Sequence, residues 1–190
     1  DYTAFRAPVA VTDTNTGDLL IGNVTYTAGS GTVAGGTNNL GVTGNAVFGN
    51  ATTDTVTGLG TLSVSGTTTI NTDTVTSAST QTYTGAVTLA AATTLTGSTV
   101  NTGATVDGAY ALTISGNADI KGAMGGTTAL SSLSVTGSSS LGANVSTTGA
   151  QTYTGAMTVG ANSTLSGSGL SLAALDLGSN ILTANETGIG

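Results

Sequence analysis

The fold is decided by a stretch that reads Leu62-Ser-Val-Ser-Gly-Thr-Thr-Thr-Ile70. Every second residue of this stretch fits the pattern L-x-[VI]-x-G-x-[AST]-x-[FIL]. Successive side chains of a strand point to opposite faces, so the alternation predicts β-strand with one apolar side. The same pattern starts again at Leu40, Leu112 and Leu133, and looser copies start at Val87 and Met157.

These six starting points are spaced like the units of a repeat array. In chain order they lie about 21 to 25 residues apart, and a period of this size is typical of solenoids and related arrays. A longer repeat lies over the short one, because QTYTGAVTL at Gln81–Leu89 returns as QTYTGAMTV at Gln151–Val159. The pattern therefore predicts a repeat body over 39–183, made of two duplicated blocks at about 40–110 and 112–183, each of about 71 residues.

The composition favours a folded all-β chain. Hydrophobic residues make up 38% of the 190 residues and charged residues only 6%, far below the roughly 25% charged residues of ordinary domains. Thr, Val, Gly, Ser and Asn are poor or mediocre helix formers and occur along the whole length. The Leu-rich segment at 170–177 is predicted to be strand as well.

The repeat predicts a β-solenoid, that is, a parallel β-helix of roughly eight coils with about 21–25 residues per coil. A single unit cannot bury both sides of its strands, whereas stacked coils enclose a continuous apolar core. With about 4.8 Å per coil the rod would be about 40 Å long. Gly-rich segments such as Gly58-Leu-Gly60, Gly125-Gly126 and Gly167-Ser-Gly169 are predicted to form corners with positive φ. A β-sandwich is the alternative fold and ranks second.

The two ends differ from the repeat body. Residues 1–38 break the pattern and hold three of the seven aromatic side chains (Tyr2, Phe5 and Tyr26) together with the single Pro. We interpret 1–38 as an N-terminal cap or an assembly segment, because an uncapped solenoid exposes strand edges that recruit another chain. Residues 184–190 are predicted to be a polar C-terminal tail. The chain starts at Asp1 without a signal-like segment, so we expect a processed mature chain or a segment of a longer one.

Two stretches carry a resemblance to a known class of protein. Leu112-Thr-Ile-Ser-Gly-Asn-Ala118 and Gln151-Thr-Tyr-Thr-Gly-Ala-Met-Thr-Val159 resemble the strand repeats of large secreted bacterial adhesins, the filamentous haemagglutinin and autotransporter passenger class. The resemblance covers about residues 40–183 and implies a right-handed parallel β-helix displayed outside the cell. The Asn-Pro motifs of the secretion-signal domain of such adhesins have no match here, so the chain resembles the repeat body alone.

The residue types present argue against an enzyme. Cys and His are both absent, which removes thiolate metal sites, most nucleophile activation and the usual general base at neutral pH. The nine acidic residues are scattered. Asp54 and Asp119 fall near adjacent units, so a carboxylate pair of the kind that glycosidases use stays open there, but isolated surface acids are favoured. We expect no catalytic, cofactor-binding or metal site.

The net charge of −7 leaves only Arg6 and Lys121 as cations. Binding to nucleic acid or to an anionic membrane surface needs clustered Lys and Arg, so neither partner is expected. No apolar run approaches the roughly 20 residues of a membrane-spanning helix.

Three weaker candidate sites remain. Asp13, Asn15 and Asp18 have the alternating oxygen donors of the first half of a calcium loop, but the distal Glu of such a loop is missing, so a polar turn is favoured and calcium binding is left open. Tyr83 and Tyr153 occupy equivalent places in the two blocks and suit either a sugar-stacking platform or a copied packing element, with packing favoured.

The third candidate is a set of Thr-x-Thr pairs of the kind that line the flat face of ice-binding solenoids. The pairs at Thr12–Thr16, Thr72–Thr76 and Thr80–Thr84 do not recur with the repeat period of about 21 to 25 residues. We therefore interpret them as outward side chains of ordinary strands.

The sequence thus predicts a non-enzymatic extracellular structural or adhesive protein at the cell surface. Its β-solenoid rod would act as a surface fibre, filament subunit or adhesin stalk, self-associating end to end or contacting cell-surface carbohydrate. The alternative is a segment of a phage tail fibre or spike, trimeric and carbohydrate-binding.

Overall fold

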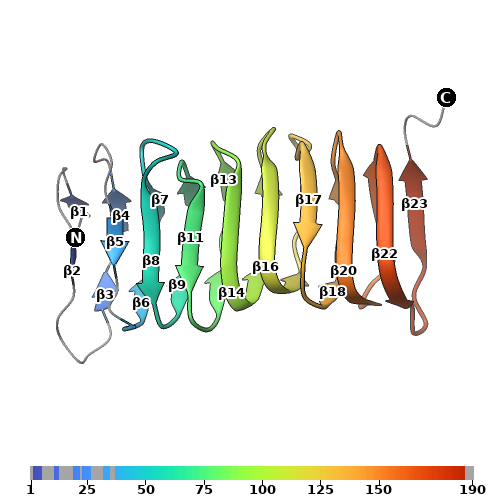
Figure 1. Cartoon of the computed structure of the whole chain (residues 1–190), viewed down its shortest axis with the longest axis horizontal. Coiled ribbons are helices and arrows are strands. Elements are labelled where there is room, and N and C mark those ends of the chain that lie inside the picture. Colours follow the sequence, from blue (N-terminus) through green and yellow to red (C-terminus); the bar gives the residue numbers. More distant parts are fainter. Residues whose placement is uncertain are drawn as a thin grey trace.

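In a computed structural model of the chain, the described residues are 37–186 in full and the backbone of five strands among residues 1–36. All regular elements of this described part are β-strands, and all of their pairings are parallel. The coils stack along the long axis into a rod (Figure 1). The prediction of an all-β solenoid is confirmed.

Each coil contributes one strand segment to each of three stacks, which we call faces 1, 2 and 3. Face 1 consists of β3 (Leu19–Ile21), β6 (Leu40–Val42), β9 (Leu62–Val64), β12 (Gln81–Tyr83), β18 (Ser139–Leu141) and the C-terminal halves of β14 (Thr93–Thr102), β16 (Ala111–Ile120), β20 (Ala150–Val159) and β22 (Gly169–Asp176).

Face 2 consists of β1 (Tyr2–Phe5), β4 (Asn23–Tyr26), β7 (Ala46–Phe48), β10 (Thr68–Ile70), β13 (Val87–Leu89), β15 (Val106–Asp107), the bridge at Met124, β19 (Val145–Ser146), β21 (Ser163–Gly167) and β23 (Leu182–Glu186).

Face 3 consists of β2 (Val11–Thr12), β5 (Thr32–Ala34), β8 (Thr55–Leu59), β11 (Thr74–Ser77), β17 (Ser132–Val135) and the N-terminal halves of β14, β16, β20 and β22. The long strands therefore run from face 3 onto face 1, and the register shifts at the corner, for example between Thr96 and Thr99 in β14.

Most coils are shorter than the predicted length of about 21–25 residues. Successive partners along face 1 are separated by about 18 to 22 residues, and they are Leu40, Leu62, Gln81, Val100, Ala118, Ser139, Met157 and Leu175. Together with the row of β3, which pairs Leu19 with Leu40, they agree with the predicted number of roughly eight coils. The length was overestimated because some successive copies of the nine-residue pattern start on different faces, so their spacing includes one extra strand.

The duplicated blocks are likewise offset by one face. The copies at Leu40 and Leu62 begin on face 1, whereas their equivalents at Leu112 and Leu133 begin on face 3. A block therefore is not a whole number of coils: it consists of three complete coils followed by two of the three strand segments of the next coil. The same local sequence folds equally well on different sides of the rod, since all three sides present alternating strands to one shared core.

That core is a single apolar cluster that extends from Leu40 to Leu165. The pattern residues Leu62, Val64 and Ile70 are at most 1% exposed, which confirms that the apolar set of the repeat points inward. A slip of one residue would turn this whole set outward, so the burial specifies the register strongly.

The corner glycines serve two different purposes. The predicted positive φ is found at Gly58 (+70°) and Gly125 (+67°) but not at Gly60, Gly126, Gly167 or Gly169. The glycines of the repeat pattern are needed chiefly because coils approach closely: a Cβ on Gly137 would lie 2.5 Å from Asn117 Oδ1 and 2.6 Å from the carbonyl oxygen of Gly116. Glycine permits the backbones of adjacent coils to stack at that distance.

The strand pairing continues beyond the predicted repeat body at both ends. Strands β3, β4 and β5 of the 1–38 segment pair with β6, β7 and β8, so this segment contributes coils to the same three faces. At the other end β22 confirms the predicted strand at 170–177, and β23 carries the pairing to Glu186.

Candidate functional site

The acidic pair that the sequence left open is not formed. Asp54 is fully buried in the loop between β7 and β8, where its Oδ2 accepts hydrogen bonds from the backbone N–H of Asn50 (2.8 Å) and Ala51 (3.3 Å). Asp119 lies on face 1, between three and four coils further along the rod, or about 14 to 19 Å at the usual strand spacing. The possibility of a glycosidase-like pair at these two residues is therefore wrong.

The other hydrogen-bonded acids also stabilise local backbone. Asp107 Oδ1 accepts the backbone N–H of Thr127 (2.8 Å) and Thr128 (3.1 Å) in the neighbouring coil. Glu186 Oε1 accepts the N–H of Leu170 at 3.0 Å. Among residues 37–186, no group of three or more His, Cys, Asp or Glu side chains could hold a metal ion. The calcium candidate at Asp13, Asn15 and Asp18 lies outside the described residues.

The two equivalent tyrosines are packing elements, so the sugar-platform alternative is wrong. Tyr83 and Tyr153 are at most 1% exposed. The Tyr83 hydroxyl donates to Gln81 Oε1 at 2.8 Å, and the Tyr153 hydroxyl donates to Gln151 Oε1 at 3.1 Å. Burial raises the pKa of both phenols well above the ordinary value, because the ionised form would lose its hydration.

Each glutamine of these pairs ties two successive coils together. Gln81 Nε2 donates to the carbonyl oxygens of Val75 (3.0 Å) and Thr96 (2.8 Å), which belong to adjacent strands of face 3. Gln151 Nε2 makes the equivalent bonds one face away, to Val145 (3.3 Å) and Ser166 (2.8 Å) on face 2. The duplication thus copied a complete buried network.

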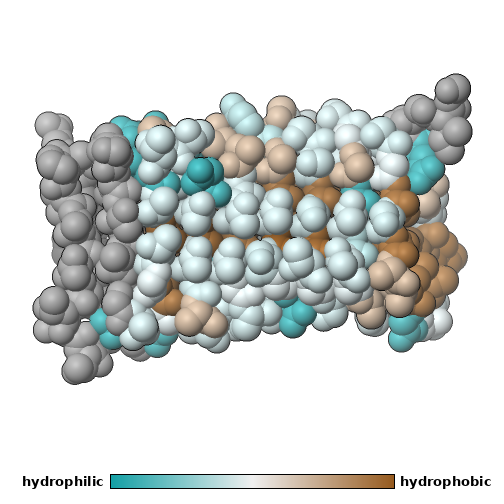
Figure 2. All heavy atoms as spheres, viewed as in Figure 1, coloured by the Kyte–Doolittle hydropathy of each residue, from teal (hydrophilic) through white to brown (hydrophobic). Residues whose placement is uncertain are grey.

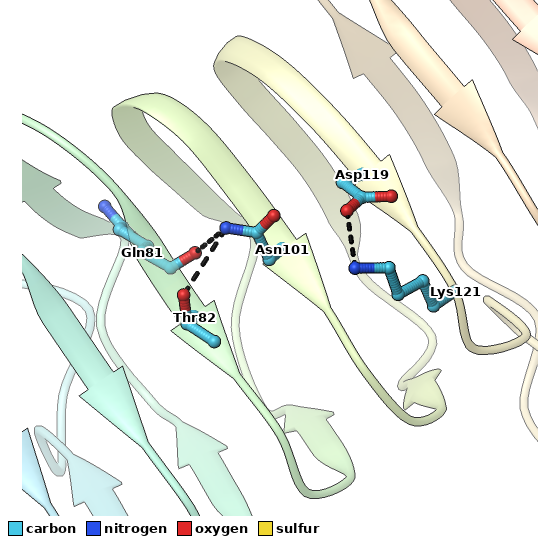
Figure 3. A network of polar contacts seen from close by, with 5 residues as sticks. All are labelled: Gln81, Thr82, Asn101, Asp119 and Lys121. Carbon is cyan, nitrogen blue, oxygen red and sulfur yellow. Dashed lines mark hydrogen bonds and ion pairs between the residues drawn. The ribbon is translucent and has the colours of Figure 1, made fainter.

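Face 1 presents a mixed polar surface (Figure 3). Asn101 Nδ2 donates to the carbonyl oxygen of Gln81 (3.3 Å) and to Thr82 Oγ1 (3.4 Å). One coil further on, Lys121 Nζ lies 2.7 Å from Asp119 Oδ2. Since Asp119 is partly exposed and Lys121 largely exposed, this ion pair contributes little to stability.

Face 3 differs from face 1 because its outward residues are almost all Thr or Ser. On each face-3 strand from β8 to β20 a buried residue is flanked by two such residues, as Thr74 and Thr76 flank Val75. We call these outward residues the Thr/Ser array. Its first column is Thr55, Thr74, Thr94, Thr113, Ser134, Thr152 and Ser171. In its second column Thr76, Thr96 and Ser115 pair from coil to coil. Thr57, Thr136 and Thr154 occupy the corresponding place in their own coils, two residues after the first column.

The array is regular, uncharged and free of large side chains. First-column residues pair directly from coil to coil, for example Thr94 with Thr113 and Thr113 with Ser134. The residues two positions before the first column are small as well, for example Ala111, which pairs with Ser132. No Asp, Glu, Lys or Arg occurs in the described face-3 strands from β8 to the N-terminal half of β22. Figure 2 shows this face as rows of pale, weakly polar side chains running along the rod.

The rejection of a periodic Thr-x-Thr face was therefore wrong. The predicted period of about 21 to 25 residues was too long, and pairs such as Thr80–Thr84 do not belong to face 3. The stacked pairs of face 3 recur after about 18 to 21 residues. The signal that could have found them is the strand length itself: a step of about six residues from face to face, as from Gln81 to Val87 to Thr93, marks three strands per coil.

Among the described residues, no helix is long and apolar enough to cross a membrane. Comparison of the chain with protein-family models, with curated proteins and with solved structures finds no match.

Proposed function

We propose that this protein is a non-enzymatic structural protein, a β-solenoid rod that serves as an extracellular surface fibre, filament subunit or adhesin stalk. The observation that carries the proposal is the continuous stack of eight coils around one apolar core. Parallel pairing from coil to coil and an unbroken core make bending costly, because any bend must open backbone hydrogen bonds or packed side chains. Such a body suits a spacer or fibre.

The use of the polar residues supports the same proposal. The buried polar groups at Asp54, Gln81 and Gln151 are hydrogen-bonded to the scaffold, so they stabilise the rod. An extracellular location is supported by the low number of basic residues: Arg6 and Lys121 offer the only cleavage points for a trypsin-like protease.

End-to-end association is supported by the last described coil. Leu175 continues the row of the fully buried Met157 but is 44% exposed, and Ile181 in the following turn is 64% exposed. Apolar side chains gather at this end of the rod in Figure 2. Covering them with another coil would bury apolar surface worth about 25 cal/mol per Å². It would also pair the outer edges of β22 and β23, which have no strand partner on that side among residues 37–186.

Electron microscopy and mass measurement over a concentration series test this function. We expect rods that lengthen into fibres as concentration rises, with a matching ladder of masses in light scattering. Leu175→Lys should reduce association because it places a charge in the joint, whereas Ser140→Lys, on the outward side of face 1, should not. A compact globular particle would contradict the rod, and a discrete trimer would favour the phage-fibre alternative.

A further inference from the structure

We propose that face 3 binds ice through the Thr/Ser array. The inference rests on the fold and on the placement of the array, and it does not depend on the rod serving as a fibre or stalk. Its ligand is the surface of a crystal of water, for which the useful property of a protein face is a repeated arrangement of weak contacts.

The spacing of the array is that of a two-dimensional lattice. Residues two apart on a strand, such as Thr94 and Thr96, lie about 6.6 to 6.8 Å apart, and stacked residues such as Thr94 and Thr113 lie about 4.7 to 4.9 Å apart. A small molecule would contact one or two of these positions. Only a ligand that is itself periodic in two directions can contact all of the rungs at once.

The chemistry of the array suits ordered water. A Thr or Ser hydroxyl both donates and accepts hydrogen bonds, so it can replace one water of a tetrahedral network. The Thr methyl group beside it cannot hydrogen-bond and restricts the orientations of adjacent water. Each contact is weak, and first-layer waters are immobilised at a small entropic cost, so strong binding requires many equivalent contacts on a rigid surface.

The rigidity of face 3 comes from within the rod. Gln81 bonds the carbonyl oxygens of Val75 and Thr96 and thereby joins two successive rungs of the array from below. Buried side chains beneath the columns, such as Ile114 and Val135, are fully enclosed. Coil-to-coil pairing then holds each hydroxyl-bearing strand at the same height above the core.

The other two faces lack these properties. The outward row on face 1 changes from Thr82 to Asn101 and Asp119. On face 2 the outward row includes Val47 and, next to Thr88, Asp107. A general preference of Thr for strands would populate all three faces alike, so the concentration of paired Thr and Ser on one uncharged face calls for a specific contact.

The test is ice-crystal growth in solutions of the purified chain, observed under a cooled microscope stage. We expect the chain to shape ice crystals and to hold their growth below the melting point, giving a measurable thermal hysteresis. Thr113→Tyr places a large ring in the middle of the array and should abolish both effects. Thr88→Tyr, the same substitution at an exposed position of face 2, should leave both unchanged. Tyr is well tolerated in strands, and far-UV circular dichroism checks the folding of each variant.

Thr152→Tyr, on a separate rung, repeats the experiment if Thr113→Tyr does not fold. The proposal is overturned if the unmodified chain neither shapes ice nor produces hysteresis. It is also overturned if Thr88→Tyr loses as much activity as the face-3 variants, because the effect would then not belong to face 3. Binding to a carbohydrate surface through face 3 without any effect on ice would identify a different ligand and refute the assignment.

Discussion

Replacing Gln81 by Leu should cost the rod a large part of its stability. The side chain is fully buried, donates two hydrogen bonds through Nε2 to Val75 and Thr96, and accepts one from Tyr83. Leu fills a similar volume but satisfies none of these groups, so two carbonyl oxygens and one hydroxyl lose their partners.

The magnitude follows from those three groups. Each buried polar group left without a partner costs about 1 to 3 kcal/mol, and the added apolar burial of Leu returns about 1 to 2 kcal/mol. The free energy of unfolding should therefore fall by about 1 to 8 kcal/mol, with a midpoint of about 4 to 5 kcal/mol, which is comparable with the whole stability of many domains. The double variant Gln81→Leu/Tyr83→Phe removes the stranded hydroxyl and should recover about 1 to 2 kcal/mol.

The duplicated network provides an internal replicate. Gln151→Leu should have the same kind of effect, and a somewhat smaller one, because two of the equivalent hydrogen bonds are longer: 3.3 Å to Val145 and 3.1 Å from Tyr153.

Urea unfolding followed by circular dichroism measures these differences, and hydrogen exchange locates them, since a repeat array can open locally. Thr82→Leu, on the outward side of the same strand, is the matched control and should change stability by less than about 1 kcal/mol. A Gln81→Leu variant as stable as Thr82→Leu would refute the reasoning that the buried amide bonds hold successive coils together.

Three further results are expected. Burial raises the pKa of Tyr83 and Tyr153, so their contribution to the free energy of unfolding is complete below about pH 10 and is lost as the pH rises further, by up to about 1.4 kcal/mol per pH unit for each phenol. Urea unfolding at a series of alkaline pH values should show this slope, and Tyr→Phe at either position should reduce it. Thr102→Val should raise the unfolding midpoint in urea by an amount equivalent to about 1 kcal/mol, because the Thr102 hydroxyl is buried without a partner; a lower midpoint would contradict this. Gly116→Ala should cost about 3 kcal/mol or more in the same assay, since Gly116 has φ of +144° and a Cβ there would overlap the carbonyl oxygen of Gly97; Gly169→Ala, with nothing within 4 Å of the added carbon, is the control that should be neutral.

Much of the fold could be predicted from local pattern. The alternation of Leu62, Val64 and Ile70 with polar residues specifies strands and their inward side, because burial of alternate side chains depends only on the strand period of two. The number of coils followed from the repeat. The packing role of Tyr83 and Tyr153 was favoured for the same reason, since a copied apolar ring at equivalent positions belongs to the copied core.

The sequence by itself determined that this chain is an all-β solenoid with one apolar core, because strand period, repeat length and the small residues at corners are all local properties. Only the tertiary structure decided how many strands form a coil, and hence which residues meet across coils. The number of strands per coil depends on where the chain turns. A nine-residue unit that spans one corner does not specify this, because it fits equally well on any of the three faces of the rod. The separation of Asp54 from Asp119 and the alignment of Thr74, Thr94 and Thr113 on face 3 both follow from it.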